Sequence, residues 1–254
     1  MLEIFRTRFK QGHRTTKFPD EEPTLPERFR GRPVVDASKC VAGCRACADA
    51  CPTQAIDATN GLALDLGKCV FCTACVDACP EQAIAYSREY QLAVNRREDL
   101  VMSGNDYVIA QRMRADVFRI VGRALRLRQV CAGGCNACEL DTNVLNTVGW
   151  DLSRFGIQFV ASPRHADGLL ITGPVTRNMQ HALMETYDAV PVPKIVIALG
   201  ACAISGGPFA GSPAVQDGVG DVLPVDLYIP GCPPHPLTIL DGLLRLIGRI
   251  KGKK

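Results

Sequence analysis

The chain has 254 residues, of which 47% are hydrophobic and 13 are cysteines, and its formal net charge is only +3. This length allows one large domain or two small ones, and the small net charge together with 6% aromatic residues gives no sign of nucleic-acid binding. A long chain with an odd number of cysteines does not fit a small disulfide scaffold, so we expect reduced thiols that are free to bind metal.

Residues 1–34 are expected to form an extended N-terminal arm. Residues 2–10 are amphipathic, with four large apolar side chains among three basic ones, which fits docking on a membrane or a membrane-bound partner, and fits a frayed terminus as well. The Pro-rich, charged stretch 19–33 is expected to wrap around a partner subunit. No secretory signal is recognised and no apolar run reaches the roughly 18 residues of a membrane span, so we expect a cytoplasmic protein.

Two cysteine tetrads in residues 35–93 form an internal repeat with a period of about 28 residues. Both tetrads end in Cys-Pro, and the second has the C-x2-C-x2-C-x3-C-P spacing of bacterial two-cluster ferredoxins. In that pattern three thiolates hold one cluster, and the fourth reaches the other cluster. The sequence therefore predicts an α+β ferredoxin-like domain with two [4Fe–4S] clusters, one held by Cys40, Cys44, Cys47 and Cys79, the other by Cys69, Cys72, Cys75 and Cys51.

The first tetrad departs from the pattern by one extra residue between Cys40 and Cys44. Gly43 lies in this gap and can absorb the extra residue through an unusual backbone angle. The type of cluster at this tetrad is left open. Zinc is the alternative for spaced cysteine pairs, but two interlocked tetrads that both end in Cys-Pro disfavour it.

A basic linker is expected over residues 94–128, with a helix around residues 111–127. Its charge fits a solvated face, and equally a surface that docks an acidic partner or lipid headgroups. The arginines that give the linker this charge are Arg112, Arg114, Arg119, Arg123, Arg126 and Arg128.

Residues 129–254 are predicted to form an α/β domain of the flavodoxin-like type with an open parallel sheet, because apolar strands and helices alternate. The expected strands lie at 159–161, 168–173, 194–200 and 225–231. The expected helices lie at 143–155, 176–187 and 236–250.

A third set of cysteines falls at one edge of this predicted sheet. Cys202 and Cys232 each follow a strand, and Cys135 and Cys138 lie in a glycine-rich loop that opens a helix. Ligands gather at the carboxyl ends of the strands in such sheets, so these four thiols are expected to hold a third [4Fe–4S] cluster. Cys131 is then the spare cysteine, because Cys135 and Cys138 have the tighter spacing, although Gly133 and Gly134 leave it mobile enough to compete for a ligand position.

Five motifs of this domain follow one another in a familiar order: CNACE at 135–139, SPRHAD at 162–167, ITGPV at 171–175, ALGAC at 198–202 and YIPGCPP at 228–234. Together they resemble the small subunit of group 4 [NiFe]-hydrogenases of the formate hydrogenlyase type, which is related to the cluster-carrying B subunit of complex I. The first 100 residues resemble the two-cluster ferredoxin-like subunit of the same complexes, through FRGRP at 29–33, KCVFC at 68–72, SREYQLA at 87–93 and the two tetrads. The chain therefore resembles a fusion of two electron-transfer subunits.

The resemblance implies an iron–sulfur subunit of a membrane-associated [NiFe]-hydrogenase complex, an oxidoreductase whose catalytic metal site is on another chain. Electrons would pass through three [4Fe–4S] clusters between the active site of a hydrogenase-like large subunit and other redox subunits. Membrane subunits of the complex would place the chain peripherally on the cytoplasmic face of the membrane.

Two other functions compete with this one. The first is the equivalent subunit of a complex I-like oxidoreductase that lacks nickel and reduces a quinone or another acceptor. The spacing Cys135-x2-Cys138 favours the hydrogenase form, because complex I has two adjacent cysteines at the first ligand position. The second is a redox-sensing or structural cluster protein, which twelve organised ligands disfavour because a sensor needs only one cluster.

The resemblance also points to residues other than cysteine. An acid near Glu139 is implicated in proton movement in this family, so Glu139 is the candidate proton relay, while a helix N-terminal acid that complements the dipole fits equally well. Asp141 is a weaker candidate for the same role. Arg164 and His165 lie in a family loop that fits an interface to the large subunit, a quinone pocket or mere packing.

Two further histidines are not expected to bind metal. His181 and His235 are each predicted to be exposed or to cap a helix.

Overall fold

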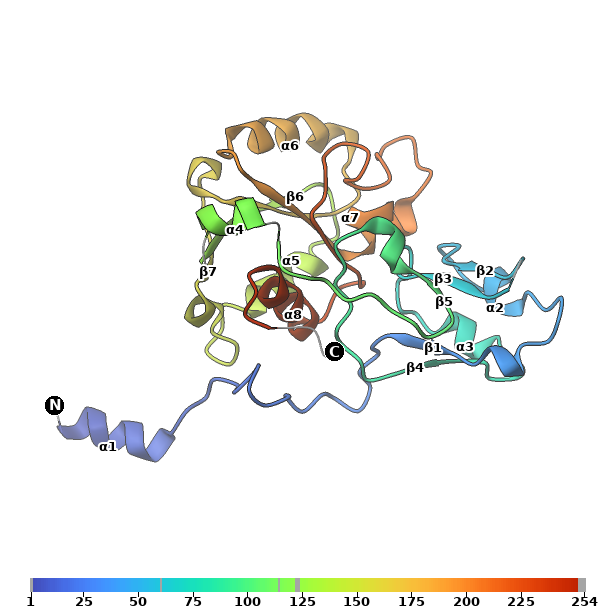
Figure 1. Ribbon diagram of the computed structural model, residues 1–254, viewed down its shortest axis with the longest axis horizontal. Helices are drawn as coiled ribbons and strands as arrows, with labels where there is room; N and C mark the ends of the chain where they lie inside the picture. Colours follow the sequence, from blue (N-terminus) through green and yellow to red (C-terminus); the bar gives the residue numbers. More distant parts are fainter. Residues whose placement is uncertain (1, 60, 114, 122–123, 251–254) are drawn as a thin grey trace.

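Five parallel strands form the central sheet of the computed structural model, which describes residues 2–59, 61–113, 115–121 and 124–250 (Figure 1). Their spatial order is β10-β9-β8-β6-β7, which is the 2-1-3-4-5 order of flavodoxin-like folds. The strands are β6 (Leu125–Cys131), β7 (Ile157–Phe159), β8 (Gly168–Thr172), β9 (Ile195–Leu199) and β10 (Leu227–Ile229). The predicted open parallel sheet is therefore confirmed.

Helices cover both faces of this sheet, and every residue of β8 and β9 is buried. One face, which includes Leu169 and Ile171, packs against α6 and α7, and the other, which includes Leu170 and Ile197, packs against α8. The helices of this α/β body are α5 (Ala137–Val144), α6 (Arg177–Ala189), α7 (Gly200–Ser205) and α8 (Pro236–Leu246). Successive residues along each strand point to opposite faces of the sheet, so each strand contributes to two separate hydrophobic cores.

Two small antiparallel sheets and two short helices form the region that carries both tetrads. β1 pairs with β4, and β3 lies between β2 and β5. The helices have only four residues each, so loops make up most of this region. The elements are β1 (Pro33–Val35), α2 (Ala46–Asp49), β2 (Ile56–Asp57), β3 (Ala63–Asp65), α3 (Ala74–Asp77), β4 (Ile84–Tyr86) and β5 (Val101–Ser103).

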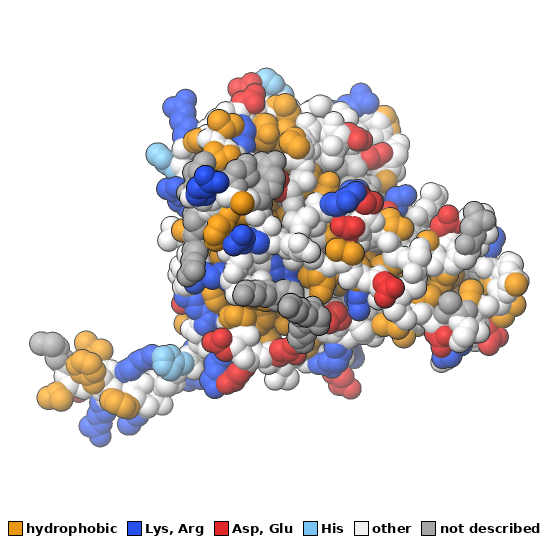
Figure 2. Space-filling view, in the orientation of Figure 1, with side chains coloured by type: hydrophobic (Ala, Val, Ile, Leu, Met, Phe, Trp, Pro, Cys, Tyr) orange, Lys and Arg blue, Asp and Glu red, His pale blue; other side chains and the backbone are white. Residues whose placement is uncertain are grey.

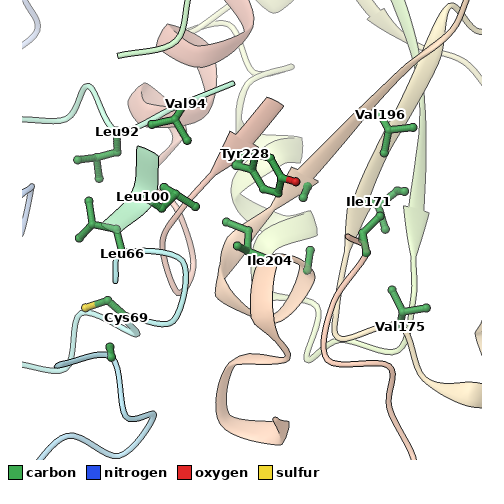
Figure 3. Packing of buried hydrophobic residues seen from close by; sticks show 14 of the residues in the cluster. Leu66, Cys69, Leu92, Val94, Leu100, Ile171, Val175, Val196, Ile204 and Tyr228 are labelled. Atoms are coloured by element: carbon green, nitrogen blue, oxygen red, sulfur yellow. The ribbon is translucent and has the colours of Figure 1, made fainter. Parts of the chain in front are cut away.

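The tetrad region and the α/β body share a hydrophobic core. Leu66 and Leu100 of the tetrad region belong to the same buried cluster as Ile204 of α7 and Tyr228 of β10 (Figure 3). Val94 also forms an antiparallel bridge with Tyr228, and the two residues exchange N–H···O bonds of 3.0 and 2.8 Å. Because β10 is an outer strand of the sheet, this bridge partly covers an open sheet edge.

The helix expected over residues 111–127 is wrong in its extent. α4 spans Ala115–Val121, and β6 already begins at Leu125. Buried Leu125 and Leu127 alternate with exposed Arg126, which is the period of a strand, so the run of arginines concealed a strand signal. Two arginines named for the linker, Arg114 and Arg123, lie outside the described residues.

The helix expected over residues 143–155 also lies elsewhere. α5 begins at Ala137, directly after Asn136, which has a positive φ of 70°, and ends at Val144. The helix therefore begins directly after the glycine-rich loop, earlier than the pattern of apolar residues predicted. β7 begins at Ile157 rather than at 159. The helices expected near α6 and α8 are confirmed.

The N-terminal arm begins with α1 (Leu2–Gln11) and continues without regular structure to β1. It packs on this chain's own body, since Phe18 is buried there and accepts a hydrogen bond of 2.8 Å at its carbonyl from Arg154 Nη2. In the part of the chain described here, no helix is both long enough and apolar enough to cross a membrane.

Candidate metal centres

The first site is a small cavity that four thiols line together. Cys40, Cys44 and Cys47 come from the first tetrad, and Cys79 comes from the second. Burial raises the pKa of the Cys47 thiol, and the nearby charges of Cys79 and Cys40 raise it further. Gly43 has a φ of 79°, so left-handed backbone accommodates the extra residue of this tetrad. The structure thus brings together all four residues predicted for this site.

The second site gathers Cys69, Cys72, Cys75 and, from the first tetrad, Cys51. Burial raises the pKa of Cys69 to about 11, and the charges of Cys75 and Cys51 contribute to this shift. The pKa of Cys75 is raised by burial and then by the charges of Cys51 and Cys72. The two tetrads therefore exchange their fourth cysteines in space, as the ferredoxin spacing predicted.

Backbone amides point at sulfur atoms in both sites. The N–H of Ala55 donates to Cys51 Sγ, and the N–H of Ala83 donates to Cys79 Sγ, both at 3.2 Å. These two bonds occupy the same position in the internal repeat. Hydrogen bonds to sulfur stabilise the thiolate form and tune the reduction potential of a bound cluster.

The third site lies at the carboxyl edge of the central sheet. Cys138 lies in the first turn of α5, Cys202 lies in the first turn of α7 after β9, and Cys232 follows β10. A Cβ added at Gly200 would lie 2.6 Å from Cys138 Sγ, so the turn between β9 and α7 touches α5 directly. This edge includes the gap between β6 and β8, where the strand order reverses and where such folds bind their ligands.

The electrostatics of this site show that its four thiols are neighbours. Burial raises the pKa of Cys138, and the charges of Cys202, Glu139, Cys232 and Cys135 raise it further, in that order. Burial also raises the pKa of Cys202 to about 11, with further contributions from Cys232 and Cys135. All four residues predicted for the third cluster are therefore close together.

Glu139 is buried beside this site. Its carboxylate accepts a hydrogen bond from the hydroxyl of Thr172, the last residue of β8. Asp141, two residues further along α5, is half-buried, and burial raises the pKa of its carboxyl group. Glu139 is therefore the acid that is held in place next to the thiols.

The second and third sites are joined by direct contacts. The hydroxyl of Ser205 in α7 donates a hydrogen bond of 2.8 Å to the carbonyl of Gly67, two residues before Cys69. Cys72 of the second site and Cys232 of the third also line one cavity of about 430 Å³. Figure 3 shows Cys69 beneath the apolar contact between the tetrad region and α7. These two sites are therefore adjacent.

The donor sets fit iron–sulfur clusters. Within the described ranges, no three His, Cys, Asp or Glu side chains are arranged to hold a single metal ion. A cubane cluster is held by thiolates that lie farther apart than the ligands of a single ion, because each thiolate binds a different iron atom. Each of the three sites offers four thiols, which are the ligands of [4Fe–4S] clusters.

Among the remaining candidates, His235 lines the same cavity as Cys72 and Cys232. Cys131 is exposed at the end of β6. Arg164 and His165 belong to a short 3-10 turn with no buried residue, and His181 lies on α6. His235 caps α8, where its Nδ1 accepts a hydrogen bond of 3.1 Å from the N–H of Leu237. Burial lowers the pKa of His235.

Three residues at these sites escaped the sequence analysis. They are Thr172, which holds Glu139, Ser205, which binds Gly67, and Tyr86, whose hydroxyl lies 3.7 Å from Cys69 Sγ. Each contacts a residue that is far away in the sequence or on another element. Only Tyr86 had a local signal, since it closes a strand that follows directly on the second tetrad.

Two family models match the chain. One is described as NADH ubiquinone oxidoreductase, 20 Kd subunit, and matches residues 135–246, which contain the third site. The other is described as 4Fe-4S dicluster domain and matches residues 39–83, which contain both tetrads.

Several curated proteins are similar to this chain. A probable membrane-bound hydrogenase subunit mbhJ of Pyrococcus furiosus is 41% identical over 143 residues, which are 55% of this chain and 86% of that protein. Formate hydrogenlyase subunit 7 of Escherichia coli is 42% identical over 141 residues, which are 56% of this chain and only 55% of that protein. The B subunit of the NADH-quinone oxidoreductase of Heliobacterium modesticaldum is 44% identical over 121 residues, which are 47% of this chain and 69% of that protein.

Proposed function

The chain belongs to the family of the NADH ubiquinone oxidoreductase 20 Kd subunit, and we propose that it is the iron–sulfur electron-transfer subunit of a membrane-associated [NiFe]-hydrogenase complex of the formate hydrogenlyase type. The observation that carries this proposal is the gathering of twelve cysteines into three sets of four thiols. A relay subunit needs several such sites in contact with one another.

The proposed ligands are the same twelve cysteines that the spacing indicated. Cys40, Cys44, Cys47 and Cys79 would hold the first [4Fe–4S] cluster, Cys69, Cys72, Cys75 and Cys51 the second, and Cys135, Cys138, Cys202 and Cys232 the third. A bound cluster of this type accepts or gives up one electron at a time. The chain's part is to supply thiolates, to aim backbone N–H groups at sulfur and to keep the sites close together.

The proposed order of the sites follows from the contacts between them. α7 and the loop before Cys69 are joined by the Ser205–Gly67 hydrogen bond, and Cys72 and Cys232 line one cavity. The third site therefore neighbours the second, and the exchanged cysteines Cys51 and Cys79 link the second to the first. The third site would face the large subunit, and the first would face another redox subunit.

Glu139 is proposed to move protons beside the third site. Its burial and the hydrogen bond from Thr172 fix one carboxylate oxygen, so the other oxygen can take part in proton transfer toward a partner. Thr172 would position Glu139, and it is not itself proposed to carry a proton.

The proposed partners are a hydrogenase-like large subunit with the catalytic metal, further redox subunits, and membrane subunits on which this chain sits at the cytoplasmic face. A second function is supported by a specific observation, since the similar proteins include the B subunit of an NADH-quinone oxidoreductase. This alternative is the equivalent subunit of a complex I-like oxidoreductase that lacks nickel and delivers electrons to a quinone or another acceptor.

The test is a count of nickel and iron in the complex purified anaerobically with this chain, by elemental mass spectrometry. We expect about one nickel per complex and at least about twelve iron atoms attributable to this chain, four for each cluster. Iron without nickel would overturn the hydrogenase function and leave the complex I-like alternative. About four or eight iron atoms from the isolated chain would overturn the assignment of three clusters.

A further inference from the structure

The helix α1 stands away from the rest of the molecule. Figure 1 shows it beyond the body at the end of the N-terminal arm, and none of its residues is buried. Four large apolar side chains are nevertheless exposed on it, with Phe9 at 89% and Leu2 at 87%. Figure 2 shows these apolar side chains next to basic ones on the isolated helix. A cluster of exposed apolar side chains of this kind marks a surface that contacts another protein or a membrane.

The side chains of α1 are sorted by face. At about 100° of rotation per residue, Leu2, Phe5 and Phe9 fall within a stripe about 60° wide. Arg6 and Lys10 lie along one side of this stripe, and Arg8 lies along the other. Ile4 is the exception, because it lies on the far side of the helix, where it is 70% exposed.

The base of the helix is fixed to the body, while the helix itself projects from it. Gly12 ends α1 with a φ of 62°, and shortly afterwards Thr15 and Thr16 bind the loop at residues 148–149. The hydroxyl of Thr15 donates to the carbonyl of Val148 at 3.0 Å, and the N–H of Thr16 donates to the carbonyl of Gly149 at 2.8 Å. A short tether thus holds an amphipathic helix at a set place beside the body.

We propose that α1 is an interfacial anchor that lies on the surface of a bilayer rich in anionic lipid. The apolar stripe would enter the boundary between headgroups and acyl chains, and the basic residues on both sides would reach the lipid phosphates. The positive charge of the helix and the residues after it supports an anionic membrane as the binding partner, because residues 2–14 contain four Arg or Lys and one Glu. A narrow apolar stripe with basic borders is the pattern of interfacial helices, whereas a helix buried in a protein groove has no need of basic residues on both borders.

The proposal does not depend on any cluster or on the nature of the partner complex. A single helix of this length binds a membrane weakly and reversibly, so it would add to the attachment that other subunits provide. Its effect can be measured on the full chain with its clusters in place, because vesicle binding is a separate readout from cluster content.

The experiment is flotation of the full holo chain with vesicles of phosphatidylcholine and phosphatidylglycerol, compared with vesicles of phosphatidylcholine alone. We expect binding to the anionic vesicles, weaker binding as salt is raised, and little binding to the neutral ones. Phe9→Ser is expected to weaken binding by about tenfold, because a buried aromatic side chain is lost from the membrane. Ile4→Ser is the matched control on the opposite face, and we expect it to weaken binding less than about twofold.

Two results would overturn the proposal. One is failure of the unaltered chain to bind the anionic vesicles, and the other is equal loss of binding in Phe9→Ser and Ile4→Ser. If vesicles are not bound but Phe9→Ser fails to co-purify with the membrane complex, the proposal is overturned and the stripe is a protein-binding surface instead. Both substituted side chains are exposed, so unchanged visible absorbance of the clusters is expected in every variant and serves as the folding control.

Discussion

The tetrad region and the third site hold the same kind of ligand on different kinds of scaffold. In the tetrad region, eight cysteines lie within residues 40–79, and the two short helices among them have four residues each. The third site draws Cys135, Cys138, Cys202 and Cys232 from loops and helix starts at the edge of a buried parallel sheet. The first scaffold is encoded locally by a repeat, and the second exists only after the sheet has formed.

This difference predicts that the two regions depend on iron to different degrees. The tetrad region has little regular structure to keep its loops in place, whereas β8 and β9 are buried throughout between the helices and strands that surround them. The largest expected effect therefore follows removal of iron with a chelator under reducing conditions. Amide hydrogen exchange over residues 35–93 should speed up by about a hundredfold or more, while exchange in β8 and β9 should change little.

Hydrogen exchange measured by mass spectrometry checks this prediction on the holo and iron-free chain. Leu66 and Leu100 pack with Ile204 in the shared core, so the peptides that contain Ile204 serve as the internal boundary between the two regions. Uniform loss of protection across both regions would mean that the sheet also needs iron, and the comparison between the two scaffolds would fail.

The second prediction concerns which cluster each cysteine holds. Cys79→Ala should empty the first site and leave the second filled, although Cys79 belongs to the second tetrad in sequence. Cys51→Ala should do the reverse, and Cys202→Ala should empty only the third site. Each variant should lose about four of roughly twelve iron atoms. Iron analysis and electron paramagnetic resonance of the reduced chain would show this. Loss of the signal from a cysteine's own tetrad in both variants would contradict the exchange of ligands.

The third prediction uses two glycines with similar backbone and different surroundings. Gly200 has a φ of 86° and a Cβ there would lie 2.6 Å from Cys138 Sγ, whereas Gly43 has a φ of 79° and nothing lies within 4 Å of an added Cβ. Both alanine variants carry backbone strain of about 1–2 kcal/mol, but only Gly200→Ala also displaces a ligand. We expect Gly200→Ala to lose the third cluster and Gly43→Ala to keep the first.

Measurements of the iron content and the free energy of unfolding of Gly200→Ala and Gly43→Ala test this prediction. Equal retention of all clusters would show that α5 moves freely, and the third site would then be no more rigid than the tetrad loops. Loss of the first cluster in Gly43→Ala would show that the extra residue in that tetrad has no room for adjustment.

The same contrast explains what the sequence could predict. The repeat and its Cys-Pro ends were enough to predict that Cys79 lies with the first tetrad, because a local spacing fixes where each thiol points. The order of apolar strands and the cysteines behind them were enough to place Cys202 and Cys232 at one sheet edge. The approach of Ser205 to Gly67 was not predictable, because it depends on how the tetrad region packs against α7, and no local pattern encodes that.

The errors have physical causes of the same kind. Residues 125–131 form β6, an inner strand that pairs with β7 and β8, yet the arginines that follow its two leucines resemble a basic helix when read without the neighbouring strands. α5 starts at Ala137 because Asn136 adopts a left-handed conformation, which a sequence does not reveal. Pairing with β7 and β8 makes residues 125–131 a strand, and the conformation of the loop that carries Cys135 sets the start of α5.

The smallest predicted effect separates the second site from the others through a single hydroxyl. The Tyr86 hydroxyl lies 3.7 Å from Cys69 Sγ. A donor at this place stabilises the extra negative charge of a reduced cluster, so Tyr86→Phe should lower the midpoint potential of the second site alone. A hydrogen bond of this kind changes the reduction equilibrium by about three- to tenfold, or roughly 30–60 mV.

Tyr107→Phe is the matched control, because the Tyr107 hydroxyl donates to the Leu92 carbonyl at 2.6 Å rather than to a thiol. A redox titration followed by electron paramagnetic resonance would detect the shift, and an equal shift in both variants would mean that the potential responds to general loosening of the tetrad region rather than to the hydroxyl.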